Sequence, residues 1–219
     1  MPAWRPRRKW TEGMIEGYRR FSASEAARRA GSLRSTCEDL ALRLLIEYAH
    51  QNELPIRIKN DSNPTGYIPV HFDSVAHYMD GVLTSTGASD LIKYQMTVLV
   101  DGARESVPSS LSRATRGDLI LLYAGGGHVQ IVTDAKKTEV SIAQGNFRPK
   151  GERCGRFTRV VWGKNQNQPR NDCYIGAIVK KDRYVYDARS RKWSYGSENS
   201  DVFSDHGRLS IWDFNYWND

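Results

Sequence analysis

The sequence lacks any long apolar run. Its longest apolar segments, such as Leu119–Leu122, are too short to cross a bilayer. Residues 1–10 are basic, and Thr11-Glu12-Gly13 follows them instead of an apolar stretch, so they do not have the pattern of a secretory signal peptide. We therefore expect no membrane span, and either a cytoplasmic protein or one that leaves the cell by a route that reads no cleavable signal.

Cysteine is scarce, with three residues in the chain: Cys37, Cys154 and Cys173. No C-x-x-C pair occurs, which excludes a zinc ribbon and a thioredoxin motif. An odd number of cysteines cannot all pair within one chain. Cys154 and Cys173 are 19 positions apart, which permits a disulfide in an oxidising compartment and leaves Cys37 as the odd thiol.

Positive charge is unevenly distributed. The formal net charge is +7, and residues 1–36 hold nine basic and three acidic side chains, so the remainder is close to neutral. A basic segment suits nucleic acid, anionic lipid or an acidic cell-wall polymer, and it also fits a solvated helix face with a loose tail. We do not expect nucleic acid, because no recognised motif is present and the aromatic residues are not interleaved with the basic cluster.

Two helices are predicted early in the chain. The first runs from Thr11, a plausible N-cap, to about Ala30, and Gly31 ends it. The second runs from about Cys37 to Gln51, with Ser35 or Thr36 as its cap. Glu38 and Asp39 suit its positive end. Its apolar residues recur at helical spacing, which predicts a wide buried stripe: Leu40, Ala41, Leu44, Leu45, Tyr48 and Ala49.

Later segments favour strands. Between them, Asp73 could cap a short helix from Ser74, Leu91–Val100 fits helix or strand, and Pro108–Arg116 is loop-like. The predicted strands are Ile56–Ile58, Asp118–Tyr123, His128–Thr133, Glu139–Gln144, Gly155–Trp162, Tyr174–Val179 and Leu209–Phe214, with a turn at Asp134–Lys137. Helices first and strands later predict an α+β fold, with the early helices packed on an antiparallel sheet.

Cys37 and His128 form a candidate catalytic pair. Cys37 stands at a helix start, where free N–H groups and aligned dipoles favour a thiolate, although free cysteines are also commonly buried as small hydrophobes. His128 opens a strand directly after Gly125–Gly127, and glycine permits close approach of another chain segment or a substrate. Gln144 and Asn146 follow one strand later, and either amide could orient the imidazole.

Cys37 before a helix, then "GDLILLYAGGGHVQIVT" and "EVSIAQGNF", resemble the CHAP and NlpC/P60 group of papain-like amidases and peptidases. The match covers roughly Ser35–Gln51 and Arg116–Phe147, under a quarter of the chain. The resemblance implies a papain-like fold with Cys37 as nucleophile and His128 as base. CHAP enzymes carry a Glu and an Asn, two residues apart, where this chain has Gln144 and Asn146. An amide in place of that carboxylate would stabilise an imidazolium less well.

The resemblance also implies a domain organisation. The interval of 91 residues from Cys37 to His128 is longer than usual in this group, which indicates an insertion around residues 60–112. We expect a basic N-terminal helical segment over residues 1–34 and a papain-like catalytic domain over residues 35–219.

Members of this group commonly cut peptide or amide bonds in bacterial cell walls, and those without a signal peptide include toxins injected into rival bacteria. The resemblance therefore predicts a cysteine amidase or peptidase acting on peptidoglycan peptides, without cofactor or metal. It would be secreted without a cleavable signal and would act in the target periplasm or cell wall. An immunity protein and a secretion-system carrier, such as that of type VI secretion, are the implied partners.

Two other readings stay open. The Cys–His pair could serve a protease, deamidase or acyltransferase acting on a protein, or the chain could be a non-catalytic basic binding protein. Among the remaining histidines, His50 suits a helix end and His206 a polar exposed stretch, while His71 and His77 lack an acidic ligand cluster at metal-site spacing. For the aromatic C-terminal end we favour core packing over a sugar platform: Trp212, Phe214, Tyr216 and Trp217.

Overall fold

The structure is a computed structural model and describes residues 5–61, 74–103, 106–122, 127–145, 147–149, 174–195 and 207–218. The helices are α1 (Glu12–Arg29), α2 (Cys37–Gln51), α3 (Val75–Ser85), α4 (Ala88–Lys93) and α5 (Val107–Ser110), with short 3-10 helices η1 (Leu111–Arg113) and η4 (Tyr216–Asn218). The strands are β1 (Arg34–Ser35), β2 (Thr97–Leu99), β3 (Leu119–Leu122), β4 (His128–Lys136), β5 (Glu139–Gln144), β6 (Phe147–Pro149), β7 (Tyr174–Ile178), β8 (Lys180–Asp187), β9 (Lys192–Tyr195) and β10 (Gly207–Trp212).

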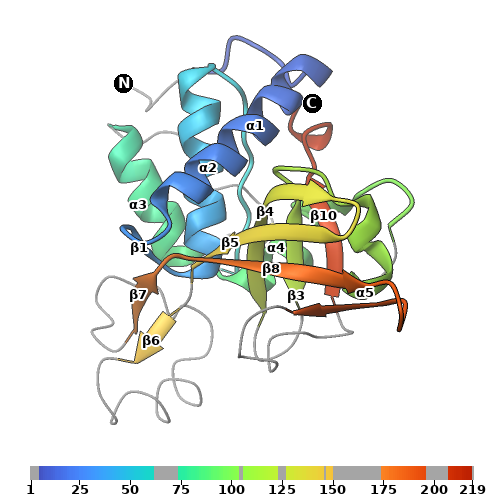
Figure 1. Cartoon of the computed structure of the whole chain (residues 1–219). Helices are drawn as coiled ribbons and strands as arrows, with labels where there is room; N and C mark the ends of the chain where they lie inside the picture. Colours follow the sequence, from blue (N-terminus) through green and yellow to red (C-terminus); the bar gives the residue numbers. More distant parts are fainter. Residues whose placement is uncertain are drawn as a thin grey trace.

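The strands form two antiparallel sheets (Figure 1). The larger sheet has seven strands in the order β2-β10-β3-β4-β5-β8-β9, and the smaller has three in the order β1-β7-β6. In the centre of the larger sheet, Ile131 of β4 lies opposite Leu119 of β3 and Ala143 of β5. The expected α+β class with an antiparallel sheet is confirmed.

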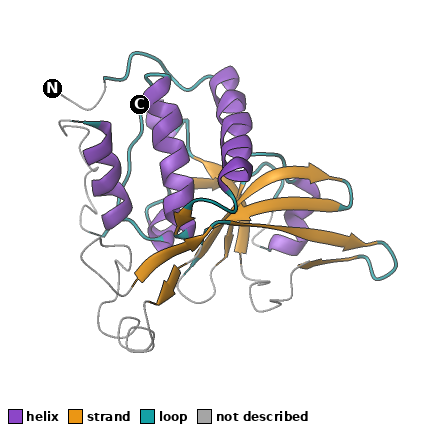
Figure 2. Cartoon of the chain, turned by 60° about the vertical axis from the view of Figure 1, so that its left-hand side comes forward, coloured by secondary structure: helices purple, strands orange, loops and turns teal. Residues whose placement is uncertain are grey.

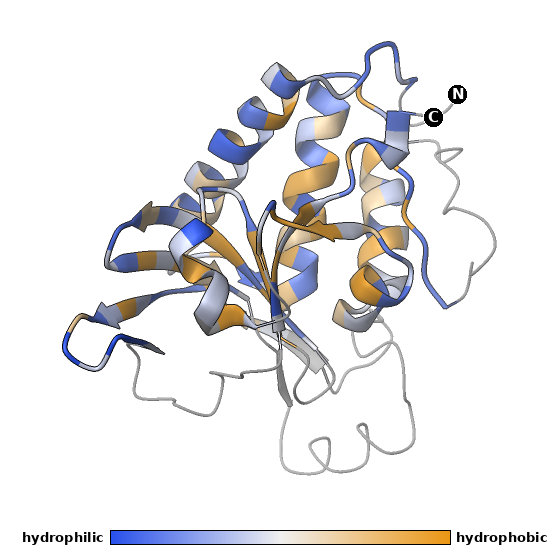
Figure 3. Ribbon diagram, turned by 90° about the vertical axis from the view of Figure 1, so that its right-hand side faces the viewer, coloured by the Kyte–Doolittle hydropathy of each residue, from blue (hydrophilic) through white to orange (hydrophobic). Residues whose placement is uncertain are grey.

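Both faces of the larger sheet are covered. Leu119 and Leu121 point into a helix-side core that also contains residues of α1, α2, α3 and α4. Ile120 and Leu122 point into a far-side core together with Val107 of α5. Figure 2 shows α1, α2 and α3 side by side, with α1 and α2 against one face of the sheet and α3 beside α2. In Figure 3, apolar residues gather where helices and sheet meet. The continuous apolar run of β3 is therefore explained by burial on both sides.

Local sequence signals set the ends of the first two helices. Thr11 caps α1 by accepting a hydrogen bond from the Met14 backbone N–H, and Gly31 takes a positive φ of 85° just after the helix. The α2 helix has the predicted bounds, with Thr36 at its N-cap and its apolar stripe fully buried. Both predicted helices are confirmed.

Several other predictions need correction. Ile56–Ile58 is not a strand in the described chain: both isoleucines are buried, but the segment has no ladder partner, so its alternation reflects burial alone. The segment expected as a loop at residues 108–116 contains most of α5 and the η1 turn. Leu91–Val100 divides between the end of α4 and β2. The predicted turn at Asp134 is a bulge, after which β4 continues to Lys136. The predicted strand at Gly155–Trp162 lies outside the described residues.

The segment around residues 60–112, expected as an insertion, takes part in the main fold where it is described. Tyr78 and Val82 of α3 are buried in the helix-side core, and β2 extends the sheet by pairing with β10. None of the helices in the described ranges is long and apolar enough to span a membrane.

The two ends of the described chain meet in an aromatic cluster. The Trp10 backbone N–H donates to Asn218 Oδ1 at 2.7 Å, and Asn218 Nδ2 donates to the Trp10 carbonyl at 2.8 Å. Trp212, Phe214 and Trp217 are buried against this pair, which confirms the core-packing interpretation for these three residues. Tyr216 is more exposed.

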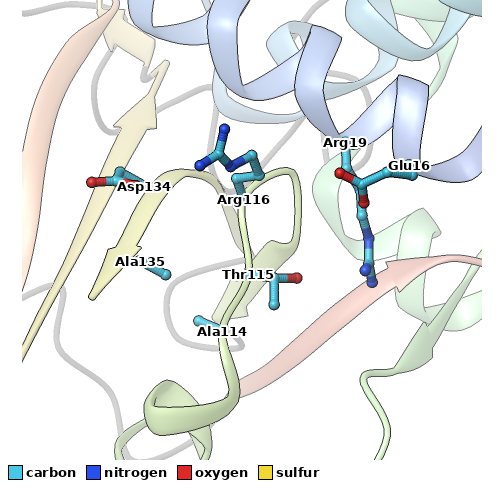
Figure 4. A pocket seen from close by; sticks show the side chains of 7 residues that line it. All are labelled: Glu16, Arg19, Ala114, Thr115, Arg116, Asp134 and Ala135. Carbon is cyan, nitrogen blue, oxygen red and sulfur yellow. The ribbon is translucent and has the colours of Figure 1, made fainter. Parts of the chain in front are cut away.

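The turn before β3 fastens α1 to the sheet. Gly117, at a φ of 84°, lies so close to α1 that a Cβ there would stand 2.4 Å from the Arg19 Cα. The next residue, Asp118, is fully buried, accepts from the Thr115 N–H and hydroxyl, and pairs with the Arg19 guanidinium at 3.2 Å. Beside this contact lies a hollow of about 290 Å³ between α1 and the end of β4 (Figure 4). The Gly-Asp step of the sequence therefore has a structural role.

We predict that Arg19→Met lowers the free energy of unfolding by about 2–4 kcal/mol at pH 8, because it leaves a buried carboxylate without its cation. Burial raises the pKa of Asp118 to about 6, against the opposing effects of Thr115 and Arg19. Losing Arg19 raises that pKa above 6, so the destabilisation should shrink as the pH falls from 8 toward 6 and the carboxyl of the variant takes up a proton.

Urea denaturation at pH 8 and pH 5 measures this difference. Arg20→Met is the matched control, since Arg20 makes an exposed pair with Glu16 at 3.9 Å and should cost no more than about 0.5 kcal/mol. Equal losses for the two variants at pH 8 would contradict the buried-pair argument.

Candidate active site

Cys37 is the first residue of α2, at the edge of the helix-side core. Its side chain is 7% exposed, and the helix behind it buries its apolar stripe completely. The thiol therefore sits on a rigid element at the end of the helix where backbone N–H groups have no partner within the helix. This is the placement expected from the sequence.

The backbone just before Cys37 is held between two glycines. Ser35 of β1 pairs with Ala177 of β7, and a Cβ on Gly176 would lie 2.6 Å from the Ser35 Cα. On the other side, a Cβ on Gly145 would lie 2.1 Å from the Thr36 carbonyl oxygen. Only glycine permits both approaches. The start of α2 is thereby fixed directly against the end of β5.

The thiol lies at the beginning of β4. The backbone N–H of Val129, the residue after His128, contributes a hydrogen bond to the sulfur. Cys37 Sγ donates to Glu38 Oε2 at 2.9 Å, and the Glu38 side chain is also buried. Between these described residues, the thiol's side-chain bond is thus to Glu38 and not to the expected imidazole.

Charge at this position favours the neutral thiol. Burial and the Glu38 carboxylate raise the pKa of Cys37 well above its ordinary value, and the backbone bonds lower it less. A helix N-terminus stabilises an anion by about 0.3–2 kcal/mol. A carboxylate 2.9 Å away opposes a thiolate by about 3 kcal/mol, which corresponds to about two pKa units. The neighbouring carboxylate therefore outweighs the preference of the helix end for a thiolate.

His128 is the first residue of β4 and carries the second predicted side chain of the site. Its Nε2 lies 2.7 Å from Gln144 Oε1 on the neighbouring strand β5, so the expected contact between these two residues is present. Burial lowers the pKa of His128, and the Gln144 bond and the Glu38 charge oppose that shift. The imidazole is therefore neutral at neutral pH and can accept a proton.

A buried network decides which imidazole nitrogen is basic. Gln144 Oε1 also accepts from Gln130 Nε2 at 2.9 Å, while Gln130 Oε1 accepts from the Tyr184 hydroxyl at 2.7 Å. The amide of Gln130 is oriented by this tyrosine, so Gln144 presents its oxygen to His128. Nε2 of His128 must then carry the hydrogen. Nδ1 is left as the nitrogen that can take a proton.

The same network extends to the edge of the sheet. Gln144 Nε2 donates to the Tyr195 hydroxyl at 2.5 Å, and the Tyr184 and Tyr195 rings pack at 5.1 Å between centroids. Residues of β4, β5, β8 and β9 thus fix one imidazole. Sequence reasoning missed Gln130, although a glutamine between valine and isoleucine in "HVQIV" was a visible signal of a buried polar role.

Other predicted residues lie elsewhere. Asn146, the reserve orienter, falls outside the described residues, as do Cys154, Cys173, His71 and His206. His50 and His77 are exposed, at the end of α2 and on α3. Within the described ranges, no three His, Cys, Asp or Glu side chains gather as a metal ion would need. The hollow in Figure 4 shares no lining residue with the Cys37–His128 group.

The chain matches no protein-family model, no curated protein and no solved structure. The chemical interpretation of the site therefore starts from its own geometry.

We predict that Gln144→Glu raises the pKa of His128 by about 1–3 units, because it places a carboxylate against Nε2. NMR titration of the histidine rings measures this, with His128→Gln to assign the signal. Gln95→Glu, which adds the same charge on an exposed turn, should leave the His128 titration unchanged. If the His128 pKa is the same in the Gln144→Glu variant as in the unaltered protein, the contact is refuted.

Gly145→Ala should destabilise the protein by about 1–3 kcal/mol, because the new methyl group overlaps the Thr36 carbonyl and pushes α2 from β5. Gly13→Ala is the matched control: its nearest neighbouring atom is 4.0 Å away, and alanine in that helix should stabilise by up to about 1 kcal/mol. Chemical denaturation compares the two. If both substitutions stabilise the fold, the close approach at Gly145 does not constrain it.

Proposed function

We propose that the chain is a cysteine amidase or peptidase with a papain-like arrangement, in which Cys37 is the nucleophile and His128 the base. The observation that carries this proposal is the meeting of three elements. The start of α2 lies against the first residues of β4, and Gln144 of β5 holds His128 at 2.7 Å. A thiol, a neutral imidazole and an orienting amide are the components of nucleophilic acyl transfer.

The reaction begins with proton transfer. Nδ1 of His128 takes the proton of the Cys37 thiol, and the electron pair left on sulfur attacks the carbonyl carbon of the substrate amide. The backbone N–H groups in the first turn of α2 are the donors that we propose for the developing oxyanion.

The attack gives a tetrahedral intermediate, and its collapse breaks the carbon–nitrogen bond of the substrate amide. The imidazolium returns its proton to the leaving amine, and an acyl group stays on sulfur. Water, deprotonated by the same nitrogen, then releases the carboxylic acid and restores the thiol. Gln144 keeps Nε2 protonated throughout, so that only Nδ1 exchanges protons. An amide in this place stabilises the imidazolium less than a carboxylate would.

For the substrate we propose the peptides of bacterial peptidoglycan. Support comes from the resemblance of the motifs around Cys37, His128 and Gln144 to cell-wall amidases, and from the basic N-terminal segment. Part of that positive charge serves the fold, since Arg29 pairs with Glu25 at 2.9 Å and Glu47 at 2.6 Å. The exposed basic residues 5–9 are the ones suited to an anionic wall.

The same proposal includes a biological setting. The protein acts as a secreted antibacterial toxin in the periplasm or wall of a target cell. A producing cell then needs an immunity protein against it and a secretion-system carrier to export it. The main competitor is a Cys–His enzyme that acts on a cytosolic protein.

Purified protein incubated with peptidoglycan fragments should yield new amine and carboxyl ends, each cleavage adding the mass of one water, as read by mass spectrometry. Cys37→Ala should abolish these products because the nucleophile is gone, and circular dichroism should show that it remains folded. The matched control is the double variant Cys154→Ala/Cys173→Ala, which should keep the activity.

Expression in a bacterial periplasm should be toxic and should depend on Cys37. Toxicity confined to the cytoplasm would instead favour a cytosolic protein target. Full toxicity of Cys37→Ala in either compartment would overturn the nucleophile assignment.

A further inference from the structure

We propose that Glu38 is a positioning residue that holds the Cys37 thiol protonated, with its hydrogen bonded to the Glu38 carboxylate, until that carboxylate moves. The proposal rests on the proposed function in taking Cys37 as the nucleophile. It assigns to Glu38 control over when that nucleophile forms.

The geometry carries the inference. Cys37 Sγ donates to Glu38 Oε2 at 2.9 Å, and both side chains are only 7% exposed, so water screens their interaction little. The His128 ring meanwhile bonds to Gln144 through Nε2. The thiol proton is therefore bonded to the Glu38 carboxylate, while Nδ1 of His128 is the nitrogen that would accept it in the proposed reaction.

The charged and titratable groups around Glu38 support the assignment. Asp39 follows it on α2, and burial together with the Glu38 charge raises the Asp39 pKa, while Arg43 lowers it. Across on β4, the Glu38 charge raises the pKa of His128. A negative charge here thus opposes a thiolate on Cys37 and favours an imidazolium on His128. Only removal of the carboxylate from the sulfur frees the thiol.

Movement of Glu38 completes the site. Once its carboxylate rotates from the sulfur, the S–H bond breaks toward Nδ1 of His128, the N–H bond forms there, and the electron pair remains on sulfur. The carboxylate charge, which raises the pKa of His128, then favours the imidazolium in the way that the neutral Gln144 cannot. Glu38 therefore restrains the resting thiol and supports the activated pair.

Alkylation of Cys37 by iodoacetamide tests this without any substrate. Rates are read across pH 5–10 by peptide mass spectrometry on protein kept reduced, so that Cys154 and Cys173 in the same sample serve as internal references. Glu38→Gln should move the Cys37 profile about two pH units lower. At pH 7 the rate should then rise about tenfold, since a hundredfold larger thiolate fraction is offset by about tenfold lower nucleophilicity. Glu38→Asp should lie between the two proteins.

Asp39→Asn is the matched control above pH 8: the pKa of Asp39 is raised to about 8, so in that part of the profile the substitution removes the same charge from the neighbouring residue without touching the sulfur. Its Cys37 rate should stay within about threefold of the unaltered protein. The proposal is overturned if Glu38→Gln leaves the profile in place or moves it upward, or if Asp39→Asn shifts it equally. Thermal unfolding of each variant separates these outcomes from loss of the fold. Absence of peptidoglycan cleavage would refute the proposed function while leaving this result intact.

Discussion

The position of α2 depends on one close approach, that of the Thr36 carbonyl to Gly145. Because no side chain intervenes, the start of the helix lies against the end of β5, where the strand leaves its neighbour β4. The backbone N–H of Val129, at the beginning of β4, is thereby brought close enough to the Cys37 sulfur to lower the pKa of the thiol. Packing along α2 then propagates this placement through the helix-side core. A steric constraint on backbone atoms, more than any attraction, brings a helix terminus to a strand end.

The polar side chains of the candidate site form a neutral group on the sheet and an acidic group on α2. His128, Gln144, Gln130 and Tyr184 form a chain of neutral hydrogen bonds, which costs little desolvation and holds the imidazole in one tautomer. The carboxylates stand instead on α2, next to the thiol. This distribution reverses the usual expectation for a helix start, because a neighbouring side-chain charge at hydrogen-bond distance exceeds the effect of the helix dipole.

Sequence reasoning reached the elements whose signals are local. Caps and periodicity located α1 and α2, and the adjacency of β4 and β5 made a contact between His128 and Gln144 foreseeable. The role of Glu38 was not predicted, because the helix dipole already accounts for an acidic residue in a first helical turn. Nothing in the sequence specifies the rotamer of its side chain. The hydrogen bonds of Tyr184 and Tyr195 to the glutamines were not predicted, because they depend on the pairing of β5 with β8, between residues far apart in the chain.

The place of β10 bears on the order in which the chain can assemble. β10 lies between β2 and β3 and bonds to both, so β2 has no partner and β3 has only β4 until residues 207–212 have been synthesised. The edge of β3 that faces away from β4 keeps unpaired backbone groups until then. Contacts of such long sequence separation favour slow closure. Nascent chains therefore pass through a long interval in which a chaperone, or another unfinished copy, can occupy the gap.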